Sequence, residues 1–322
     1  MKVHPLEFEK PIVELEHKME DIKKHLLGRK DIDLNPEVQK IAAKIEATRR
    51  EIHLNLTAWQ RVQIARHIQR PFFLDYIQNA FTDFIELHGD RLFGDDASMP
   101  AGLATIGDFK CVVIGQQKGR DVKENLLRNF GSPHPEGYRK ALRLMRMAER
   151  FSLPIVTLID TPGAFPGVGA EERHIAEAIA VNIREMMILR TPIVSVVIGE
   201  GGSGGALGIG VADRVLMLEN SYYSVISPEG CAAILWKHRK HAPEAAEALK
   251  LNAQELVKLG VVDGVIQEPP GGAHHDHQAA ADFLKDAVLK ALQSVSRLST
   301  EKMLEQRYNK FRQMGVTATE AL

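Results

Sequence analysis

The chain has 322 residues, 44% of them hydrophobic and 26% charged, which is ordinary for a soluble globular protein with one large domain or two smaller ones. A net charge of −1 argues against a broad basic surface for nucleic acid or an anionic membrane, and two isolated cysteines, Cys111 and Cys231, support neither a disulfide framework nor a thiolate zinc site. The first residues lack the apolar core of a signal peptide and no stretch is apolar enough to span a bilayer, so we expect a cytoplasmic protein.

Residues 1–90 are predicted to form a helical extension. Apolar residues recur every three or four positions over residues 12–26 and 38–52, and Gly28 and Pro36 separate the two stretches. This pattern predicts two amphipathic helices joined as a hairpin. Because two helices bury too little apolar surface to be stable alone, the hairpin should pack on the main body or on a partner subunit.

A third helix is predicted over residues 72–88, because apolar residues again fall on one side at helical spacing: Phe73, Ile77, Phe81, Phe84 and Ile85. Packing explains the apolar stripes of all three helices, so no site is expected on them.

From residue 101 the chain follows a rhythm of two strands and a helix. Two strands should pair as a hairpin around the turn Gly107-Asp108. A later helix should begin at Ser227, a good N-cap, with Pro228 in its favoured first position. This ββα repetition differs from the regular βαβ order of a doubly wound sheet. The other predicted elements are a helix at 138–150, a strand at 154–159, a loop at 160–167, a helix to about 189, and strands at 192–198, 214–218 and 222–226.

The sequence Gly199-Glu200-Gly201-Gly202-Ser203-Gly204-Gly205-Ala206-Leu207-Gly208, called the glycine segment below, follows directly on the apolar strand 192–198. So many glycines indicate a backbone that approaches another group closely and needs unusual dihedral angles. The small residues from Ala206 onward predict the first turn of a buried helix. A strand that leads through a glycine turn into a helix presents free N–H groups and the positive end of a dipole. The segment therefore predicts a site for an anion or an oxyanion.

One alternative is a dinucleotide site. Gly199, Gly201 and Gly204 match G-x-G-x-x-G, and Glu219 follows at a suitable distance. However, a βαβ unit needs a crossover helix of about a dozen residues, and residues 205–213 are too few.

A second alternative is a hydrolase nucleophile. The run from Gly201 to Gly205 matches G-x-S-x-G, which would make Ser203 the nucleophile. Asp263 with His274 or His275 would then complete a triad. The glycines, however, can be explained without a nucleophile.

Several blocks of the chain together resemble a known family, the α subunits of bacterial acetyl-CoA carboxylase carboxyltransferases. The resemblance covers nearly the whole chain, and the blocks occur in order with compatible spacing. The blocks are Gly-Asp-Arg-Leu-Phe-Gly-Asp-Asp at 89–96, Gly-Gln-Gln-Lys-Gly at 115–119, the 160–167 loop, the glycine segment, Ser-Pro-Glu-Gly at 227–230, the run 259–269 and Gly-Gly-Ala-His at 271–274.

The resemblance implies an α/β fold, a crotonase-like (ClpP/crotonase) ββα spiral with a helical N-terminal hairpin and C-terminal helices. It implies three parts: the helical extension 1–90, a carboxyltransferase core at 91–270 and a helical segment at 271–322. The family's enzyme transfers the carboxyl group from carboxybiotin, which is tethered to a biotin carrier protein, to acetyl-CoA, and so gives malonyl-CoA for fatty acid synthesis.

The resemblance also implies partners. A β subunit of the same fold would carry a zinc ribbon and most of the acetyl-CoA site, and two α and two β subunits would form a heterotetramer that works with the biotin carrier protein and biotin carboxylase. The lack of a four-cysteine pattern in this chain agrees with zinc in the partner only.

For the site, the family match assigns the backbone N–H groups of Gly204 and Gly205 to the ureido oxyanion of biotin. Gly163, Ala164, Gly202 and Ala206 are expected to line the same pocket. On this assignment, Gly205→Val should lower kcat for carboxyl transfer by roughly a hundredfold or more and change the fold little.

Three further groups of polar residues carry weaker expectations. The run His274-His275-Asp276-His277 looks like a metal site, but adjacent histidines on a polar loop are usually solvated, so no metal is expected. One helix face carries Arg139, Arg143, Arg146 and Arg150, which would either be solvated or meet CoA phosphates or the carrier protein. Lys118 and Arg120 lie near the end of the predicted hairpin, where they would approach substrate or only serve the fold.

Overall fold

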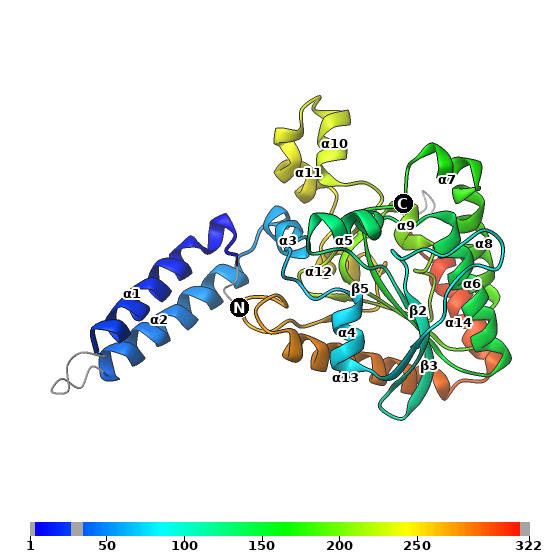
Figure 1. Cartoon of the computed structure of the whole chain (residues 1–322), viewed down its shortest axis with the longest axis horizontal. Helices are drawn as coiled ribbons and strands as arrows, with labels where there is room; N and C mark the ends of the chain where they lie inside the picture. Colours follow the sequence, from blue (N-terminus) through cyan, green and yellow to red (C-terminus); the bar gives the residue numbers. More distant parts are fainter. Residues whose placement is uncertain (1–3, 27–34, 316–322) are drawn as a thin grey trace, which may run out of the picture.

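The computed structural model describes residues 4–26 and 35–315, and a sheet of eight strands forms the centre of this part of the chain (Figure 1). The strand order is β1-β2-β3-β4-β5-β6-β8, with β7 paired to the end of β5. The pairs β1–β2 and β2–β3 are antiparallel, and the pairs from β3 onward are parallel. The strands are β1 Thr82–Glu86, β2 Ala101–Ile106, β3 Phe109–Gly115, β4 Ile155–Thr161, β5 Ile193–Gly202, β6 Arg214–Leu218, β7 Tyr222–Ser224 and β8 Gly264–Ile266.

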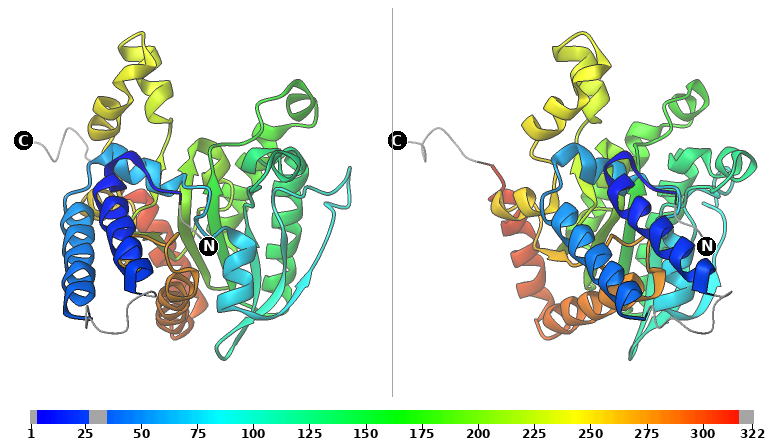
Figure 2. Two further views of the ribbon diagram at one scale, coloured as in Figure 1. Left: turned by 60° about the vertical axis from the view of Figure 1, so that its left-hand side comes forward. Right: turned by 90° about the vertical axis from the view of Figure 1, so that its left-hand side faces the viewer.

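Helices cover both faces of the sheet (Figure 2). Every residue of β4 and β5 is buried, as expected for parallel strands between two helical layers. Alternate residues of β3 serve the two layers: Val112 and Ile114 face one apolar core, and Cys111 and Val113 face the other. The first core is closed by α6 Pro135–Arg150 and α8 Ile175–Ile188, and the second by α4 Phe73–Ala80 and α13 His277–Ser296.

The remaining helices are shorter or lie toward the ends of the chain. Two of them, α10 and α11, form a projection at one end of the molecule (Figures 1 and 2). None of the helices within residues 4–26 and 35–315 has the length and hydropathy needed to cross a membrane. The other bounds are α3 Ala58–Ala65, α5 Val122–Leu127, α7 Val168–Glu172, α9 Ser203–Leu207, α10 Pro228–Leu235, α11 Ala242–Ala248, α12 Ala253–Lys258 and α14 Thr300–Arg312, with 3-10 turns at Glu7–Glu9 (η1), Asn129–Gly131 (η2) and Arg239–His241 (η3).

Most predicted elements of the core are confirmed. The strands β2 and β3 pair up to Ile106 and Phe109, and the turn between them has Gly107 at a φ of +55°. The Ser227 hydroxyl accepts a hydrogen bond from the Gly230 N–H and so caps α10. The two helices α13 and α14 confirm that the C-terminal segment is helical.

The third predicted helix is wrong in its second half. The helix α4 ends at Ala80, Phe81 has extended dihedral angles, and the next residues form the edge strand β1. Phe84 contacts Phe73 edge-on, whereas Ile85 is 59% exposed. These two neighbours point to opposite sides, as in a strand, and the helical spacing of the stretch arose because an apolar helix runs directly into an apolar strand.

The N-terminal hairpin is confirmed, with α1 at Lys10–Leu26 and α2 at Asn35–Leu54. Gly28, which was predicted to separate the helices, lies outside the described residues. The two helices lie side by side and extend away from the α/β body (Figure 1), and their apolar stripes are thinly covered, with Ile12 and Ile45 buried. The outer part of the hairpin is therefore available to a partner subunit.

Removing residues 1–56 should leave the α/β body folded but impair assembly with a partner subunit. The cut spares α3, which is capped by Thr57 and packs into the body through Ala58 and Val62. We expect an unchanged circular dichroism spectrum for residues 57–322 and a loss of complex in size-exclusion chromatography with light scattering. A truncated chain that assembles and works normally would show that the hairpin is dispensable.

Candidate active site

The bend of the glycine segment lies later than the sequence predicts. The strand β5 continues through Gly202, and its last residues, Glu200–Gly202, pair with β7. The chain turns at Ser203, which has a φ of +51°, and the five-residue helix α9 follows. Three of the six glycines of the segment, Gly199, Gly201 and Gly202, are thus residues of a strand, and close packing rather than the turn explains them.

The close packing is between backbones. A Cβ atom on Gly202 would lie 2.2 Å from the Pro162 carbonyl oxygen, and one on Gly205 would lie 2.5 Å from the Ala164 nitrogen and from the Gly163 carbonyl carbon. Only glycine permits these contacts. The 160–167 loop and the glycine segment are therefore pressed together, and the structure brings Gly163 and Ala164 next to Gly205 as predicted.

Gly204 is the exception within the segment. A Cβ atom there would meet nothing nearer than the Ile179 side chain, at 3.8 Å. Gly204 opens instead on a concavity of about 300 Å³, called the glycine pocket, with mainly apolar walls. Its lining includes Ser203, Leu207, Tyr223, Val225, Val261 and Phe311.

None of the four predicted pocket residues is among the described residues that line this cavity, and Gly163 and Ala164 lie instead against the backbone of Gly205. Ala206 is fully buried in the apolar core beneath α6, and Gly202 is buried against the 160–167 loop. Neither lines the glycine pocket in the described structure, and their role in binding substrate stays a prediction. The first turn of α9 nevertheless leaves backbone N–H groups without intrahelical acceptors, as every helix start does.

Two side chains hold the Gly205 peptide in place. The Gln116 amide nitrogen and the Tyr138 hydroxyl each donate a hydrogen bond of 3.0 Å to the Gly205 carbonyl oxygen. The Gln116 side-chain oxygen in turn accepts the Asp160 N–H at 3.0 Å. These bonds fix the direction of the peptide that follows Gly205 and connect α9 to β3, β4 and α6. The roles of Gln116 and Tyr138 could not be deduced from the sequence, although Gln116 lies in one of the family blocks.

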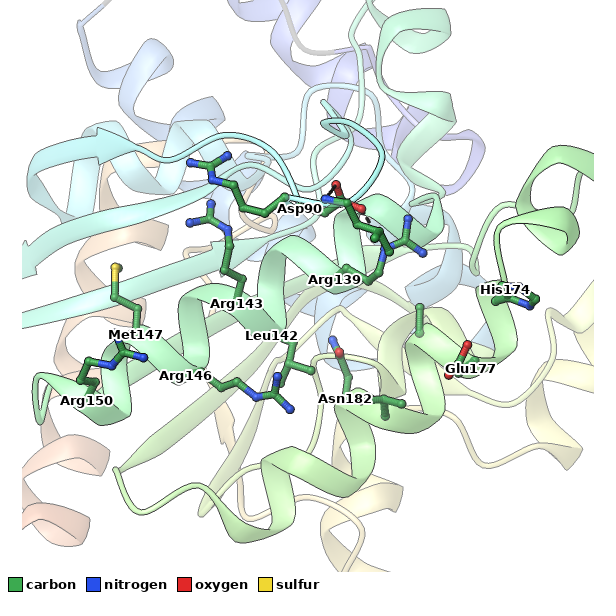
Figure 3. Close-up of a pocket in the computed structure, with 14 residues that line it drawn as sticks. Asp90, Arg139, Leu142, Arg143, Arg146, Met147, Arg150, His174, Glu177 and Asn182 are labelled. Carbon is green, nitrogen blue, oxygen red and sulfur yellow. Dashed lines mark hydrogen bonds and ion pairs between the residues drawn. The ribbon is translucent and has the colours of Figure 1, made fainter.

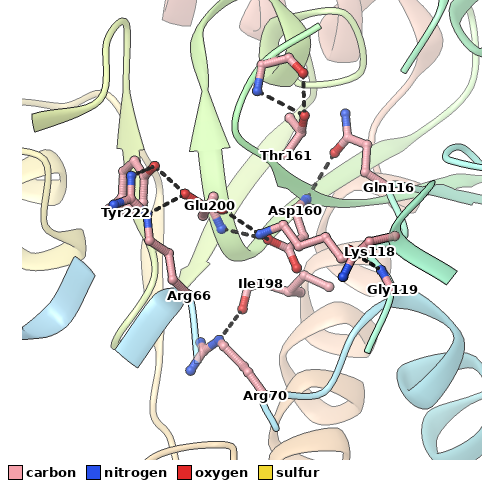
Figure 4. Close-up of polar contacts among 12 residues, drawn as sticks. Arg66, Arg70, Gln116, Lys118, Gly119, Asp160, Thr161, Ile198, Glu200 and Tyr222 are labelled. Atoms are coloured by element: carbon pink, nitrogen blue, oxygen red, sulfur yellow. Dashed lines mark hydrogen bonds and ion pairs between the residues drawn. The ribbon is translucent and has the colours of Figure 1, made fainter. Parts of the chain in front are cut away.

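A network of buried charges lies behind the glycine segment (Figure 4). The Lys118 ammonium contacts Asp160 Oδ1 at 2.5 Å and Glu200 Oε2 at 2.7 Å. Glu200 Oε1 accepts hydrogen bonds from Arg66 and from the Tyr222 hydroxyl. Since Asp160 Oδ1 also accepts the Glu200 N–H at 2.9 Å, the network joins the ends of β4 and β5.

The charges in this network are fixed by their partners. Burial alone would raise the pKa of Glu200, but Lys118 and Arg66 outweigh it and lower that pKa to about 2. Burial would lower the pKa of Lys118, and the two carboxylates raise it instead. Burial raises the pKa of Asp160. The sequence alone did not decide whether Lys118 and Arg120 contact substrate. In the structure, Lys118 forms ion pairs with Asp160 and Glu200, and Arg120 forms one with Asp75, so both side chains are engaged within the fold.

The nucleophile hypothesis is wrong. Asp263 contacts Lys310 and accepts the Val215 N–H, and His274 and His275 lie against Glu9. None of these residues lines the glycine pocket beside Ser203 within the described chain. The dinucleotide hypothesis is also wrong, because α9 has only five residues and cannot form the crossover helix of that fold.

The four arginines of α6 line a concavity of about 690 Å³ together with Arg91 and His174 (Figure 3). Three of them are already bonded within the protein: Arg139 to Asp90, Arg143 to the Gly89 carbonyl and Arg146 to Glu185. Burial and the neighbouring Arg91 lower the pKa of Arg143. The arginines form a basic hollow rather than a flat solvated face.

Comparison with known proteins supports the family. A family model described as acetyl co-enzyme A carboxylase carboxyltransferase-like matches residues 5–315. The chain is 56% identical over 312 residues to the acetyl-coenzyme A carboxylase carboxyl transferase subunit alpha of Geobacter metallireducens, covering 97% of this chain and 98% of that one. It is 56% identical to the subunit of the same name from Thermus thermophilus, over 98% and 99% of the two chains.

Solved structures show the fold. A Pseudomonas malonate decarboxylase hetero-tetramer matches with a TM-score of 0.55 and 16% identity, over 71% of this chain and 88% of that one. The transcarboxylase 12S structure matches with a TM-score of 0.52 and 20% identity, over 67% and 41%. The crotonase-like fold expected from the sequence is confirmed.

Proposed function

Because the chain belongs to the family of acetyl-CoA carboxylase carboxyltransferase α subunits, we propose that its glycine segment stabilises the ureido oxyanion of biotin during carboxyl transfer. Acetyl-CoA carboxylase is a biotin-dependent enzyme, and this chain is a carboxyltransferase component of it. The observation that carries the proposal is the opening of Gly204 on the glycine pocket, at the first turn of α9. There the N–H groups of Gly204 and Gly205 have no acceptor in the helix.

Carboxyl transfer from biotin requires hydrogen-bond donors for the ureido oxyanion and does not require a basic side chain of the protein. Carboxybiotin, delivered by the carrier protein, would release its carboxyl group as carbon dioxide and be left with negative charge on the ureido oxygen. N1 of the ureido group would then take a proton from the acetyl methyl, and the resulting enolate would attack the carbon dioxide to give malonyl-CoA. Backbone N–H groups suit such an oxyanion, at about 3–4 kcal/mol for each donor. The described lining of the glycine pocket includes neither a carboxylate nor a histidine, which agrees with this division of roles.

The surrounding residues orient the donors. The two bonds to the Gly205 carbonyl and the backbone contact with Gly163 and Ala164 hold α9 at a fixed angle to β4. A donor that is already oriented costs no reorganisation when charge develops on the substrate. Gly202 contributes by allowing β5 to lie against the 160–167 loop, and Ala206 by packing α9 into the core.

The proposal includes a partner for the second half of the reaction. A β subunit of the same fold would supply the acetyl-CoA site, a second pair of donors for the enolate and the zinc ribbon, in a heterotetramer of two α and two β subunits in the cytoplasm. The N-terminal hairpin that extends from the body, and the malonate decarboxylase neighbour that is described as a hetero-tetramer, are consistent with such an assembly. The product would be malonyl-CoA for fatty acid synthesis.

The purified chain should therefore be inactive alone and active with its β partner. Two crotonase-like domains must face each other to bring the reacting atoms within roughly 3–3.5 Å. The activity is measured as carboxyl transfer from malonyl-CoA to biocytin, which is monitored through the decarboxylation of malonyl-CoA. Transfer by the α chain in the rigorous absence of β would contradict the proposal, and so would an α–β complex that forms but transfers nothing.

A further inference from the structure

Four side chains from three distant parts of the chain converge beside the base of the hairpin. Glu9 ends η1, His53 lies at the end of α2, and His274 and His275 lie in the loop before α13. The Glu9 Oε1 atom is 3.7 Å from His274 Nε2, 3.7 Å from His275 Nε2 and 3.8 Å from His53 Nε2. The expectation that these histidines are solvated is wrong for His274, whose side chain is fully buried.

The converging atoms are not hydrogen-bonded to one another. Distances of 3.7–3.8 Å exceed a hydrogen bond, and Glu9 Oε1, His53 Nε2 and His274 Nε2 are buried without any partner in the described chain. The other carboxylate oxygen of Glu9 is used, because it accepts the Leu6 N–H at 2.8 Å. Leaving several buried polar atoms unpaired is costly, which indicates that a further group satisfies them.

Neighbouring histidines behave differently and provide an internal comparison. His67 stacks on His274 with ring centroids 4.2 Å apart, but its ring nitrogens bond to the His4 carbonyl and the Gln69 N–H. His277, three residues after His274, bonds to the Gln69 carbonyl at 2.7 Å. Among the buried ring nitrogens of the described residues, those without a hydrogen-bond partner are thus found only on histidines that lie beside Glu9.

The charge state of the cluster favours a cation. Burial lowers the pKa of His274 to about 4 and also lowers that of His53, which leaves both rings neutral at pH 7 with a lone pair to donate. Burial would raise the pKa of Glu9, but the nearby histidines and the Leu6 N–H lower it. Arg49, on the same helix as His53, is paired with Glu16 and Glu46. The cluster therefore places a buried carboxylate beside the neutral imidazoles of His53 and His274.

We propose that Glu9, His53, His274 and His275 bind a divalent metal ion of the zinc class. Imidazole nitrogens with one carboxylate form a donor set that suits Zn²⁺. The ligand atoms of Glu9, His274 and His275 all lie within 4.8 Å of one another, and His53 Nε2 lies 3.8 Å from Glu9 Oε1. A tetrahedral zinc ion separates its ligand atoms by roughly 3.3–3.4 Å, so binding would draw the imidazole rings inward around the carboxylate, His53 furthest. The ion would join η1, α2 and the loop before α13, and would fix the hairpin to the body. It is separate from the zinc expected in the β subunit.

The test is metal binding by the full chain. After treatment with EDTA and removal of the chelator, the chain is titrated with Zn²⁺ and then with Co²⁺, whose visible absorption reports tetrahedral geometry, and its metal content and unfolding midpoint are measured. We expect one tight zinc equivalent, a higher unfolding midpoint and a tetrahedral cobalt spectrum. Glu9→Gln and His53→Gln should each weaken zinc binding by roughly tenfold or more.

His277→Gln is the matched control, since it changes the nearby histidine at the first residue of α13, whose ring nitrogen bonds to the Gln69 carbonyl. It should keep the zinc equivalent and the cobalt spectrum. Circular dichroism of each metal-free variant shows whether a loss of zinc binding results from a loss of folding. If His53→Gln fails to fold, Glu9→Gln alone tests the site, because glutamine is close in size to glutamate. The proposal is overturned if the folded chain binds no zinc, or if Glu9→Gln and His277→Gln bind it equally well.

Discussion

The variant Gly204→Val should lower the turnover number of carboxyl transfer by about 100-fold and leave the chain folded. A Cβ atom at this position lies 3.8 Å or more from its nearest neighbours, both on Ile179, so the added side chain has room without moving the backbone. Because Gly204 lines the glycine pocket, the branched side chain would lie at the edge of that pocket beside the two N–H groups that we assign to the ureido oxyanion. The measurement is kcat for carboxyl transfer to biocytin by the complex reconstituted with β.

Ser203→Ala is the matched control for this variant. It changes the neighbouring residue, keeps a non-glycine side chain at the positive φ of +51°, and removes only a hydroxyl. Turnover should change by no more than a few-fold, whereas a nucleophilic serine would be indispensable. Circular dichroism and light scattering establish that both variants fold and assemble. A well-folded Gly204→Val complex with normal turnover would exclude the first turn of α9 from the mechanism.

The equivalent change at Gly205 is not a clean test, although the sequence suggests it. A side chain there would meet the backbone of Gly163 and Ala164 at 2.5 Å, and these atoms cannot yield as a flexible side chain would. The expectation that Gly205→Val changes the fold little is therefore wrong. The two adjacent glycines look equivalent in the sequence, and only their neighbours in space distinguish them.

The sequence predicted the fold where local signals and tertiary structure agree. The β2–β3 hairpin has a glycine turn between alternating strands, and α10 has a serine cap followed by proline. The sequence-based prediction failed over residues 72–88, because an apolar helix is followed directly by an apolar strand, with no glycine or proline between them to mark the boundary. The division at residues 90 and 270 stays a prediction.

The candidate site was predicted in part. The glycine segment was recognisable from its composition, and Gly204 does open on a pocket. The residues that support it were not recognisable, because Gln116, Tyr138 and Gly205 meet only through the folding of β3, α6 and β5. The burial of His274 was missed for the same reason, since its neighbour Glu9 lies at the other end of the chain.

Replacing Lys118 with methionine should destabilise the chain by about 3–5 kcal/mol. Methionine fills a similar volume but leaves Asp160 and Glu200 buried without the ammonium that contacts both at 2.5 and 2.7 Å. The side chain of Lys118 is only 12% exposed, so water cannot replace the lost partner. Urea unfolding of the purified chain, followed by circular dichroism, gives the free energy of unfolding.

Two comparisons establish that the buried charge is the cause. Lys123→Met, at an exposed position on α5, should change the free energy of unfolding by less than about 0.5 kcal/mol. Adding Glu200→Gln to Lys118→Met removes one of the stranded carboxylates and should restore part of the stability, because a neutral amide costs less to bury than an unpaired ion. If Lys118→Met and Lys123→Met were equally stable, the network would not hold β4 against β5. The position of the glycine segment would then depend on the pairing of β4 with β5 and on backbone packing, without the ion network.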